Sequence, residues 1–379
     1  MLKRVCLILL LPWAQWAASH GQVPGLECLY RAGDGGYACF RIPALVSTSQ
    51  GALLAFAEAR KKDCGDAGDI DLVMRRSVDR GRTWSSLTVV WDDTGNTCGN
   101  PAPVVDRKSG RILLFSTWNL GTDREPAIIE QKSKDTRRVF LLASTDEGLS
   151  WTTPREVTTD VKMPDWTWYA TGPGNGIQIR KGPYAGRLVI PCDHIEAVTR
   201  KYFSHTILSD DGGATWRLGG TTPLDRVNEC AVAEADDGRL LLNMRNYDGS
   251  RHRKTSFSDD GGASWSMPVA DTALPEPVCQ AGMLRLRSSG RNPLIAFSNP
   301  ASTQKRVNMT VRWSRDGGRS WYASKTVHPG PSAYSSLVGL PGGRLGLLFE
   351  GGVTSAYEGI SWTILGKPGR NRRKESIPD

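Results

Sequence analysis

Three arginines in the sequence could together bind a carboxylate. They are Arg41, Arg245 and Arg306, spread along a chain of 379 residues. A guanidinium offers planar, paired N–H donors that match the two oxygens of a carboxylate, and it stays charged at physiological pH. No glycine-rich anion loop and no cluster of metal ligands accompanies these arginines, so the sequence does not indicate a phosphate site. It predicts a site for an acidic small molecule.

A tyrosine and two acids could supply chemistry beside that carboxylate. Tyr334 offers a phenol as nucleophile, and Glu229 could accept its proton. Asp66, in a CGDAG segment that we expect to be mobile, could act as general acid for a leaving oxygen. A neutral phenol avoids the repulsion that an Asp or Glu nucleophile would meet at a carbon bearing a carboxylate. The set could therefore support nucleophilic displacement, with general acid–base catalysis, beside a bound carboxylate.

A repeated turn pattern identifies the elements that must position these residues. The pattern S-x-D-x-G-x-[S/T]-W occurs five times, and a sixth stretch has Tyr357 in place of the Asp. The Asp should accept N–H bonds across a tight turn, the Gly should have a positive φ, and the Trp should pack beneath the hairpin. The copies are Ser77–Trp84, Ser144–Trp151, Ser209–Trp216, Ser258–Trp265 and Ser314–Trp321, and the sixth stretch is Ser355–Trp362.

A second repeat consists of glycines that precede apolar runs. They are Gly51, Gly110, Gly186, Gly238 and Gly343, and residues 292–297 are the equivalent in the fifth unit. Each unit then reads strand, Gly turn, strand, loop, strand, Asp turn, strand. Four-stranded units repeated around an axis form a β-propeller, whereas the rungs of a β-solenoid are far shorter. The sequence predicts an all-β fold, a six-bladed β-propeller with four-stranded antiparallel blades.

The position within each unit places the polar residues at one end of the propeller. Suppose that the first strand of each unit runs down to its Gly turn and the second strand returns. Residues about nine before or seven after the glycine then lie at the same end of the propeller, which we call the mouth. Arg41, Glu229 and Tyr334 lie 10, 9 and 9 residues before their glycines, and Glu58, Arg245 and Glu350 lie 7 after theirs. Asp66 and Arg306 fall in loops at the same end, and the Asp turns fall at the other. Each residue alone could be a solvated group or an inter-blade salt bridge, but the shared phase favours a site.

The two ends of the chain differ in composition from the repeats. Residues 1–21 read as a signal peptide, with Lys3 and Arg4 before an apolar run, although a buried N-terminal strand or helix is the alternative. Residues 22–366 hold the repeats, and residues 367–379 form a basic tail that we expect to be flexible. No other segment reaches the roughly 18 apolar residues that span a membrane. We expect a protein of the secretory pathway, in the lysosome lumen or secreted.

Charge and cysteine content limit the kinds of ligand and cofactor that we expect this protein to bind. The net charge is +9; the leader carries two of these charges and the tail a net of three, so the body keeps +4. Such a body could attract nucleic acid or an acidic substrate, but no nucleic-acid-binding motif accompanies it. Seven cysteines remain without the leader, so at least one is unpaired; a Cys28–Cys39 bond is possible, but the sequence does not assign connectivity. We expect no metal and no cofactor, because the chain has no CxxC pair and only five scattered histidines.

Several short segments resemble the exo-α-sialidase (neuraminidase) family. Residues 40–43 (FRIP) resemble its FRIP motif, and the repeated turns resemble its Asp boxes. Further segments with matching spacing are 58–66, 75–77, 228–230, 243–246, 298–300, 306–308 and 330–336. The resemblance spans about residues 36–351 and is nearest to animal lysosomal and bacterial secreted sialidases.

That resemblance implies a retaining exo-α-sialidase that removes terminal sialic acid from glycoproteins, gangliosides and oligosaccharides without a cofactor. Arg41, Arg245 and Arg306 would bind the sialic carboxylate, and Glu350 would orient Arg41. Arg60 would line the pocket near the other substituents of the sugar.

The resemblance also implies roles for the chemical groups. Tyr334 would be the nucleophile, Glu229 its base partner and Asp66 the acid/base. A non-catalytic lectin on the same propeller would lose one of these three, so their presence favours an enzyme, whereas a trans-sialidase stays open. A scaffold for protein partners would not need the three arginines. The segment Trp166–Gly176 is either a rim loop or a packed inter-blade turn. The tail lacks a tyrosine-based sorting signal, which leaves lysosome and secretion both open.

Overall fold

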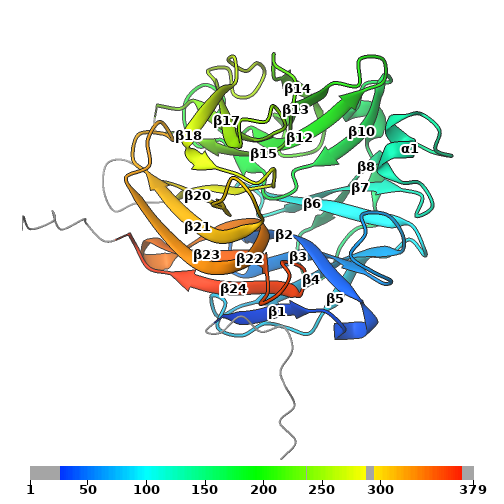
Figure 1. The fold of residues 1–379 in the computed structure, drawn as a ribbon, viewed down its shortest axis with the longest axis horizontal. Coiled ribbons are helices and arrows are strands. Elements are labelled where there is room, and N and C mark those ends of the chain that lie inside the picture. The colour runs from blue at the N-terminus through cyan, green and yellow to red at the C-terminus, as the bar shows by residue number, and fades with distance from the viewer. Residues whose placement is uncertain (1–25, 236, 287–293, 369–379) are drawn as a thin grey trace, which may run out of the picture.

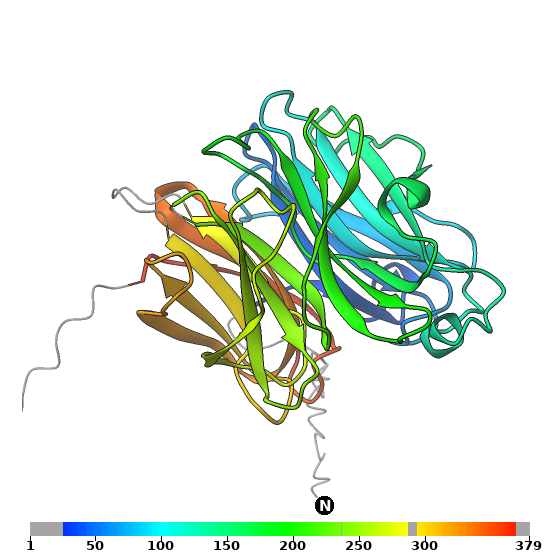
Figure 2. The same cartoon turned by 90° about the horizontal axis from the view of Figure 1, so that it is seen from above.

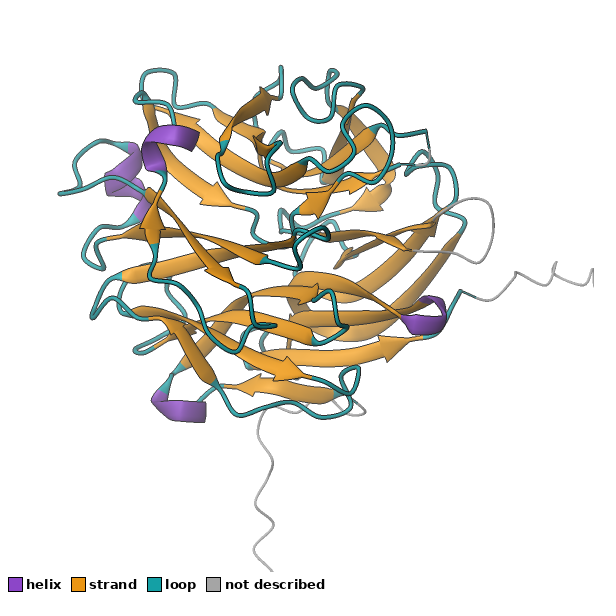
Figure 3. Ribbon diagram, turned by 180° about the vertical axis from the view of Figure 1, so that it is seen from behind, coloured by secondary structure: helices purple, strands orange, loops and turns teal. Residues whose placement is uncertain are grey.

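The computed structural model describes residues 26–235, 237–286 and 294–368. Within these residues strands are by far the main regular secondary structure, joined by loops, as Figure 3 shows; the two α-helices, α1 (Glu125–Ile129) and α2 (Thr158–Val161), are short. The expected signal peptide lies outside the described residues, as does the tail beyond residue 368. In the described part of the chain, no helix is long and apolar enough to cross a membrane.

The strands form four sheets in which almost all pairs are antiparallel. The eight-stranded sheet contains β2 (Cys39–Ser47), β3 (Leu53–Arg60), β4 (Ile70–Ser77), β5 (Thr88–Trp91), β6 (Thr97–Val105), β7 (Ile112–Asn119), β8 (Arg138–Ser144) and β9 (Arg155–Glu156). The five-stranded sheet contains β10 (Trp166–Thr171), β11 (Ile177–Gln178), β12 (Leu188–Glu196), β13 (Tyr202–Ser209) and β14 (Arg217–Thr221). The four-stranded sheet contains β15 (Val227–Glu234), β16 (Leu240–Asn246), β17 (His252–Ser258) and β18 (Val269–Pro275). The seven-stranded sheet contains β19 (Gly282–Leu286), β20 (Leu294–Pro300), β21 (Val307–Ser314), β22 (Ala323–Leu340), β23 (Arg344–Gly351), β24 (Gly359–Leu365) and β1 (Glu27–Arg31).

The inner strands of these sheets contact one another in a closed circuit. It runs from β2 to β6, β12, β15, β19 and β22 and back to β2. In Figure 1, β2, β6, β15 and β22 lie near the middle of the molecule, and β5, β14 and β18 lie toward its edge. Figure 2 shows the first half of the chain (blue to green) beside the second half (yellow-green to orange). β1 pairs with β24, so the beginning of the described chain joins the last strand.

The five complete Asp turns have the predicted construction. In one copy, Asp211 accepts hydrogen bonds from the Thr215 backbone N at 3.0 Å, the Thr215 hydroxyl at 2.6 Å and the Ser209 hydroxyl at 2.8 Å. Gly213 has a φ of +86°, where an L side chain would be strained. Trp216 packs edge-on against Phe115 of β7, with ring centroids 4.6 Å apart. The turn therefore ties one unit to the preceding one.

The sixth stretch is not such a turn, and the prediction is wrong there. Residues 352–358 form the loop between β23 and β24, and Trp362 lies inside β24. The carboxylate of Glu358, rather than an Asp at position 357, accepts the backbone N–H groups of Val353, Thr354 and Ser355. The pattern matched because its Ser, Gly and Trp recur, but without the Asp the acceptor that closes the turn is missing.

Strand register confirms that the Asp turns and the predicted mouth lie at opposite ends. In the β3–β4 pair, Arg60 lies opposite Ile70 at the mouth end, and Leu53 lies opposite Ser77 at the Asp-turn end. Seven steps of about 3.3 Å separate these ends by roughly 23 Å. A cavity of about 1040 Å³ lies toward the turn end, and its lining includes none of the predicted site residues.

Two other expectations are resolved by the packing. Cys39 forms a disulfide with Cys64, and Cys28 is free. The Cys28–Cys39 bond is wrong because β1, which carries Cys28, pairs with β24 and not with β2. The segment Trp166–Gly176 begins with β10 and then packs inside the molecule, where the Asn175 amide donates to the Leu337 carbonyl at 3.0 Å. It is therefore a packed segment between sheets.

Candidate active site

Tyr334 lies at the centre of the predicted site. It belongs to β22, and only 6% of its surface is exposed. The centroid of its ring lies 5.2 Å from the guanidinium carbon of Arg41 and 5.7 Å from that of Arg306. Arg245 Nη1 donates to its hydroxyl at 3.1 Å. The three arginines identified in the sequence therefore surround one phenol, although Arg41 and Arg245 belong to different sheets and Arg306 lies in the loop before β21.

The Tyr334 hydroxyl donates a hydrogen bond to a carboxylate. Tyr334 Oη donates to Glu229 Oε1 at 2.5 Å, and Arg245 Nη1 donates to Glu229 Oε2 at 2.6 Å. Burial and the negative charge of Glu229 raise the pKa of Tyr334 well above its ordinary value, and Arg245 opposes them only in part. The resting phenol is therefore neutral, with an acceptor for its proton already in contact.

Glu350 on β23 contacts both Arg41 and Tyr334, and its side chain is fully buried. Its Oε1 accepts from Arg41 Nε at 3.1 Å and from the Ile42 backbone N at 2.8 Å. Its Oε2 accepts from the Tyr334 backbone N at 3.2 Å. Burial acts to lower the pKa of Arg41, but Glu350, Tyr334 and Asp66 together outweigh it, so the pKa lies above the ordinary value. Glu350 therefore sets the position of the guanidinium relative to the phenol.

Asp66 lies in the loop between β3 and β4 and faces two arginines. Its Oδ1 accepts from Arg60 Nη1 at 2.8 Å and from Arg41 Nη1 at 3.1 Å. Partial desolvation by the surrounding protein acts to raise the pKa of Asp66, but Arg60 and Arg41 outweigh it and the pKa is lowered. Arg60 also donates to the carbonyl groups of Cys64 and Gly65. The segment is therefore fastened at several points, and the expectation of a freely mobile loop is wrong in this respect.

Bulges in the inner strands lie next to the predicted residues. The pairing register shifts in β2 just after Arg41, in β15 around Glu229 and in β22 around Tyr334. A bulge bends its strand and redirects a side chain, and bulges are frequent beside active sites. Ile42 inside the first bulge has a φ of +57°, which is unusual for a β-branched residue. The sequence pattern gave no sign of these bulges.

Tyr357 is a site residue that the sequence interpretation misplaced at the turn end. Its hydroxyl accepts from Arg306 Nη1 at 2.8 Å, and its ring centroid lies 4.4 Å from the guanidinium carbon of Arg41. It follows Glu350 by seven residues, in a loop after the second strand of its unit. Asp66 and Arg306 occupy the same place in their own units, so the repeat phase could have found Tyr357.

Comparisons with known proteins agree with this arrangement. Residues 51–347 match the family described as a BNR repeat-like domain. A sialidase of Micromonospora viridifaciens is 35% identical over 93% of this chain, and an exo-alpha-sialidase of Aspergillus fumigatus is 32% identical over 86% of this chain and 84% of its own length. The chain belongs to the exo-α-sialidase family of glycoside hydrolases. It spans 57% of the length of the Micromonospora sialidase.

A solved structure, the Hadza microbial sialidase Hz136, extends the comparison to the fold of this family. It is 29% identical, with a TM-score of 0.81, and the match covers 90% of this chain and 68% of the other. The closed circuit of inner strands and the sialidase relatives together identify the fold as an all-β propeller.

Two further buried groups, which the sequence analysis did not name, interact with charged residues of this sialidase-family site. Asp193 on β12 is 1% exposed, and burial with the charges of Glu229 and Glu125 raises its pKa well above the ordinary value. Arg137 precedes β8; it donates to the Tyr169 carbonyl at 3.0 Å and is buried. Asp193 lies seven residues after the repeat glycine Gly186, in the same phase as Arg245 and Glu350, so the repeat could have found it. Arg137 belongs to neither repeat, so the pattern gave no sign of it.

The predicted residues thus gather at one mouth around a neutral phenol. The gathered set is Arg41, Arg60, Asp66, Glu229, Arg245, Arg306, Tyr334 and Glu350. Such a mouth can hold an anion on three guanidiniums and present a nucleophile with its base. The guanidinium of Arg60 is directed at the Asp66 loop; its predicted contact with a sugar stays a prediction.

Proposed function

We propose that this chain is a retaining exo-α-sialidase that hydrolyses terminal sialic acid from glycoproteins, glycolipids and oligosaccharides. The observation that carries the proposal is the contact of the Tyr334 hydroxyl with Glu229 at 2.5 Å inside a ring of three arginines. Sialic acid bears its carboxylate on the anomeric carbon, so a site that binds the carboxylate also fixes the reacting atom.

Substrate binding uses the three guanidiniums. Arg41, Arg245 and Arg306 hold the carboxylate by charge-assisted hydrogen bonds, which are stronger than neutral ones. Glu350 keeps Arg41 in place, since it binds Nε and leaves Nη1 for other acceptors. The anomeric carbon is then held close to Tyr334 Oη, as bond formation between these two atoms requires.

In the first step, Tyr334 Oη forms a bond to the anomeric carbon while the bond from that carbon to the leaving oxygen breaks. Glu229 takes the phenol proton, and Asp66 gives a proton to the leaving oxygen. In the second step, Asp66 takes a proton from water, whose oxygen bonds to the anomeric carbon as the bond to Tyr334 breaks. Glu229 returns its proton to the phenol. Two displacements retain the configuration, and sialidases with a tyrosine nucleophile are a known exception to the two-carboxylate rule.

Asp66 must be protonated before it can act as an acid, whereas Arg60 and Arg41 lower its pKa in the empty site. A bound substrate carboxylate forms an ion pair with Arg41, so Asp66 experiences less of the positive charge of that arginine. The bound sugar also excludes water from the carboxyl group. Both changes raise the pKa of Asp66 toward the protonated state that the first step requires.

The sheets divide naturally into six blades of four strands. β22 has 18 residues and pairs with β21 through its first part and β23 through its second, so it supplies one strand to each of two blades. β1 completes the last blade as the partner of β24. The closed circuit of inner strands supports this division. The Cys39–Cys64 disulfide supports an oxidising compartment, the lysosome lumen or the exterior.

Turnover of sialyllactose tests the proposal. The chain is incubated with sialyllactose in the presence and absence of excess ¹³C-labelled lactose, and the products are followed by NMR. We expect free sialic acid that appears first as the α-anomer, with little label in sialyllactose. Transfer to the labelled lactose would identify a trans-sialidase, and saturable binding without turnover would identify a lectin.

A further inference from the structure

The loop between β3 and β4, which carries Asp66, is short of packing contacts of its own. The side chain of Asp66 is 64% exposed, and Lys62, Asp63 and Gly65 are exposed as well. Such a loop has many accessible conformations, while proton transfer needs the donor within hydrogen-bond reach of the leaving oxygen. Something must therefore restrict this loop, and besides the Arg60 contacts the structure has fastenings at two places.

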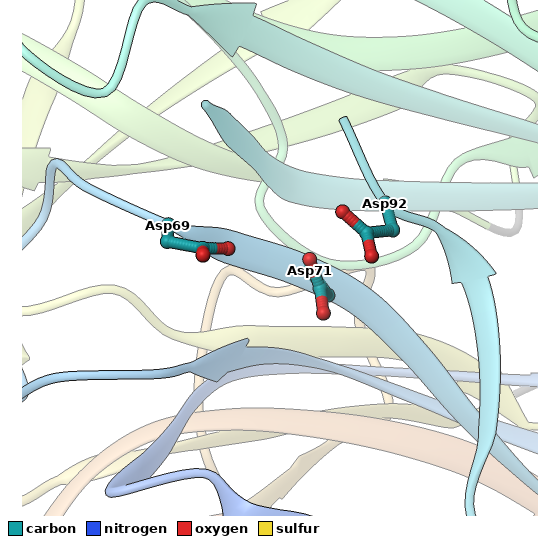
Figure 4. A group of neighbouring side chains, drawn as sticks. All are labelled: Asp69, Asp71 and Asp92. Atoms are coloured by element: carbon teal, nitrogen blue, oxygen red, sulfur yellow. The ribbon is translucent and has the colours of Figure 1, made fainter. Parts of the chain in front are cut away.

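The base of the loop is closed by a lysine among three carboxylates. Lys61 Nζ lies 3.0 Å from Asp69, 3.3 Å from Asp71 and 3.8 Å from Asp92. Figure 4 shows the three acids, with Asp69 and Asp71 on neighbouring parts of the chain and Asp92 on a separate segment. Their oxygens lie close enough together to hold a metal ion, but the ammonium group of Lys61 already supplies the cation. The cluster is therefore a clamp across the two ends of the loop.

The tip of the loop is fastened to a different strand. Cys64, two residues before Asp66, is bonded to Cys39 at the beginning of β2. β2 also carries Arg41, two residues after Cys39, whose guanidinium contacts both Asp66 and the Tyr334 ring. The disulfide thus joins the strand that carries Arg41 to the loop that carries Asp66. Each of these two residues follows its cysteine by two positions.

We propose that the Cys39–Cys64 disulfide is a positioning element for the general acid, which holds Asp66 at the distance from Arg41 and Tyr334 that protonation of the leaving oxygen needs. This inference rests on the proposed sialidase function. Arg60 contributes hydrogen bonds to the Cys64 and Gly65 carbonyls, but these bonds are not covalent, and its salt bridge to a carboxylate that is 64% exposed is weak. The covalent bond constrains the backbone of Cys64, and the Arg60 contacts then orient the side chain of Asp66.

The leaving group separates positioning of the acid from general structural damage. Lactose leaves sialyllactose as a poor leaving group that needs a proton, whereas 4-nitrophenol leaves its sialoside without one. For the Cys39→Ala/Cys64→Ala variant we expect kcat/KM to fall about tenfold on sialyllactose and less than about twofold on the 4-nitrophenyl sialoside. The matched control is Cys28→Ala, which removes a free, half-buried thiol from β1 and should leave both values unchanged.

A second cycle and a reduction experiment keep the test decisive if the double variant folds poorly. In the Asp66→Ala background, removal of the disulfide should produce no further selective loss, because the acid is already absent. In the wild-type chain, dithiothreitol gives two electrons and two protons to the disulfide and becomes a cyclic disulfide itself. Reduction should lower the kcat/KM for sialyllactose relative to that for the 4-nitrophenyl sialoside, and reoxidation should restore this ratio. Circular dichroism checks that the fold is kept.

The outcomes distinguish this inference from the proposed function. A wild-type chain that turns over neither sialoside removes the proposed function, and this inference with it. A wild-type chain that is active, with equal losses on both substrates or no loss after removal of the disulfide, overturns only the positioning role.

Discussion

The two ends of the same strands use carboxylates in different ways. At the turn end, Asp211 is satisfied by donors at most four residues away, and the other complete Asp turns have the same construction. At the mouth, the partners are remote in sequence: Arg41 and Glu350 are separated by 309 residues, and Tyr334 and Glu229 by 105. A locally satisfied acid stabilises its own turn, whereas a remotely satisfied acid exists as a site only when the whole propeller has folded.

The pKa values of the acids at the two ends also have different causes. Hydrogen bonds from Thr215 lower the pKa of Asp211 to about 2, and no substrate displaces these donors. At the mouth the pKa of Asp66 is lowered by Arg60 and Arg41, full positive charges that a substrate carboxylate can neutralise. The turn end therefore has fixed protonation states, and the mouth has protonation states that a ligand can change.

The largest expected effect separates the two ends completely. Tyr334→Phe removes one oxygen from the mouth and should lower kcat/KM on a fluorogenic sialoside by about 10⁴-fold or more, because the nucleophile is lost. The melting temperature should change little, since the ring and its packing remain. Tyr322→Phe, which removes another phenol outside the mouth, is the matched control. Activity near the wild-type level in Tyr334→Phe would exclude the proposed mechanism.

The next effect tests whether the exposed acid belongs to the mouth. Asp66→Ala should lower kcat/KM on sialyllactose by about 10²-fold or more and affect an aryl sialoside far less, since only the former needs a proton. Asp63→Ala removes a carboxylate from the same loop and should show no such selectivity. If Asp66→Ala lost equal activity on both substrates, Asp66 would have no role as acid.

A smaller effect is expected at the turn end. Asp211→Ala removes hydrogen bonds to the Ser209 hydroxyl and to the backbone and hydroxyl of Thr215. We expect a loss of about 1 kcal/mol in the free energy of unfolding, with kcat/KM unchanged. Urea unfolding and a sialoside assay on the same preparation measure both. A drop in kcat/KM with intact stability would mean that the two ends are coupled.

The smallest effect is a dependence on pH. The pKa of Asp211 falls from its ordinary 3.8 to about 2 on folding, so its contribution to stability is complete above pH 3.8 and disappears as the pH falls through about 2. The stability difference between wild type and Asp211→Ala should therefore be constant from pH 8 to about 4 and shrink below that. A difference that grew on acidification would contradict this sign.

The sequence predicted the local parts of the molecule well. The five Asp turns are confirmed because each depends on a few neighbouring residues, and the repeat phase placed Arg41, Glu229 and Tyr334 at the end opposite to those turns. Tyr357 was misplaced because Ser, Gly and Trp without the Asp mimic the turn pattern.

The remaining errors concern contacts between remote segments. The Cys28–Cys39 bond failed because β1 pairs with the last strand of the chain, which spacing along the sequence does not reveal. The buried Arg137 belongs to no repeat, and the bulges that redirect Glu229 and Tyr334 arise from strand pairing. Only the folded circuit of strands brings these features together.

Covalent trapping tests the central claim most directly. A 2,3-difluorosialic acid loses fluoride from its anomeric carbon to the nucleophile, and its second fluorine slows the hydrolysis of the adduct. We predict that peptide mass spectrometry of the trapped chain finds one sialyl adduct, on Tyr334. An adduct on Glu229 or Asp66 instead, with Tyr334 unmodified, would contradict the account.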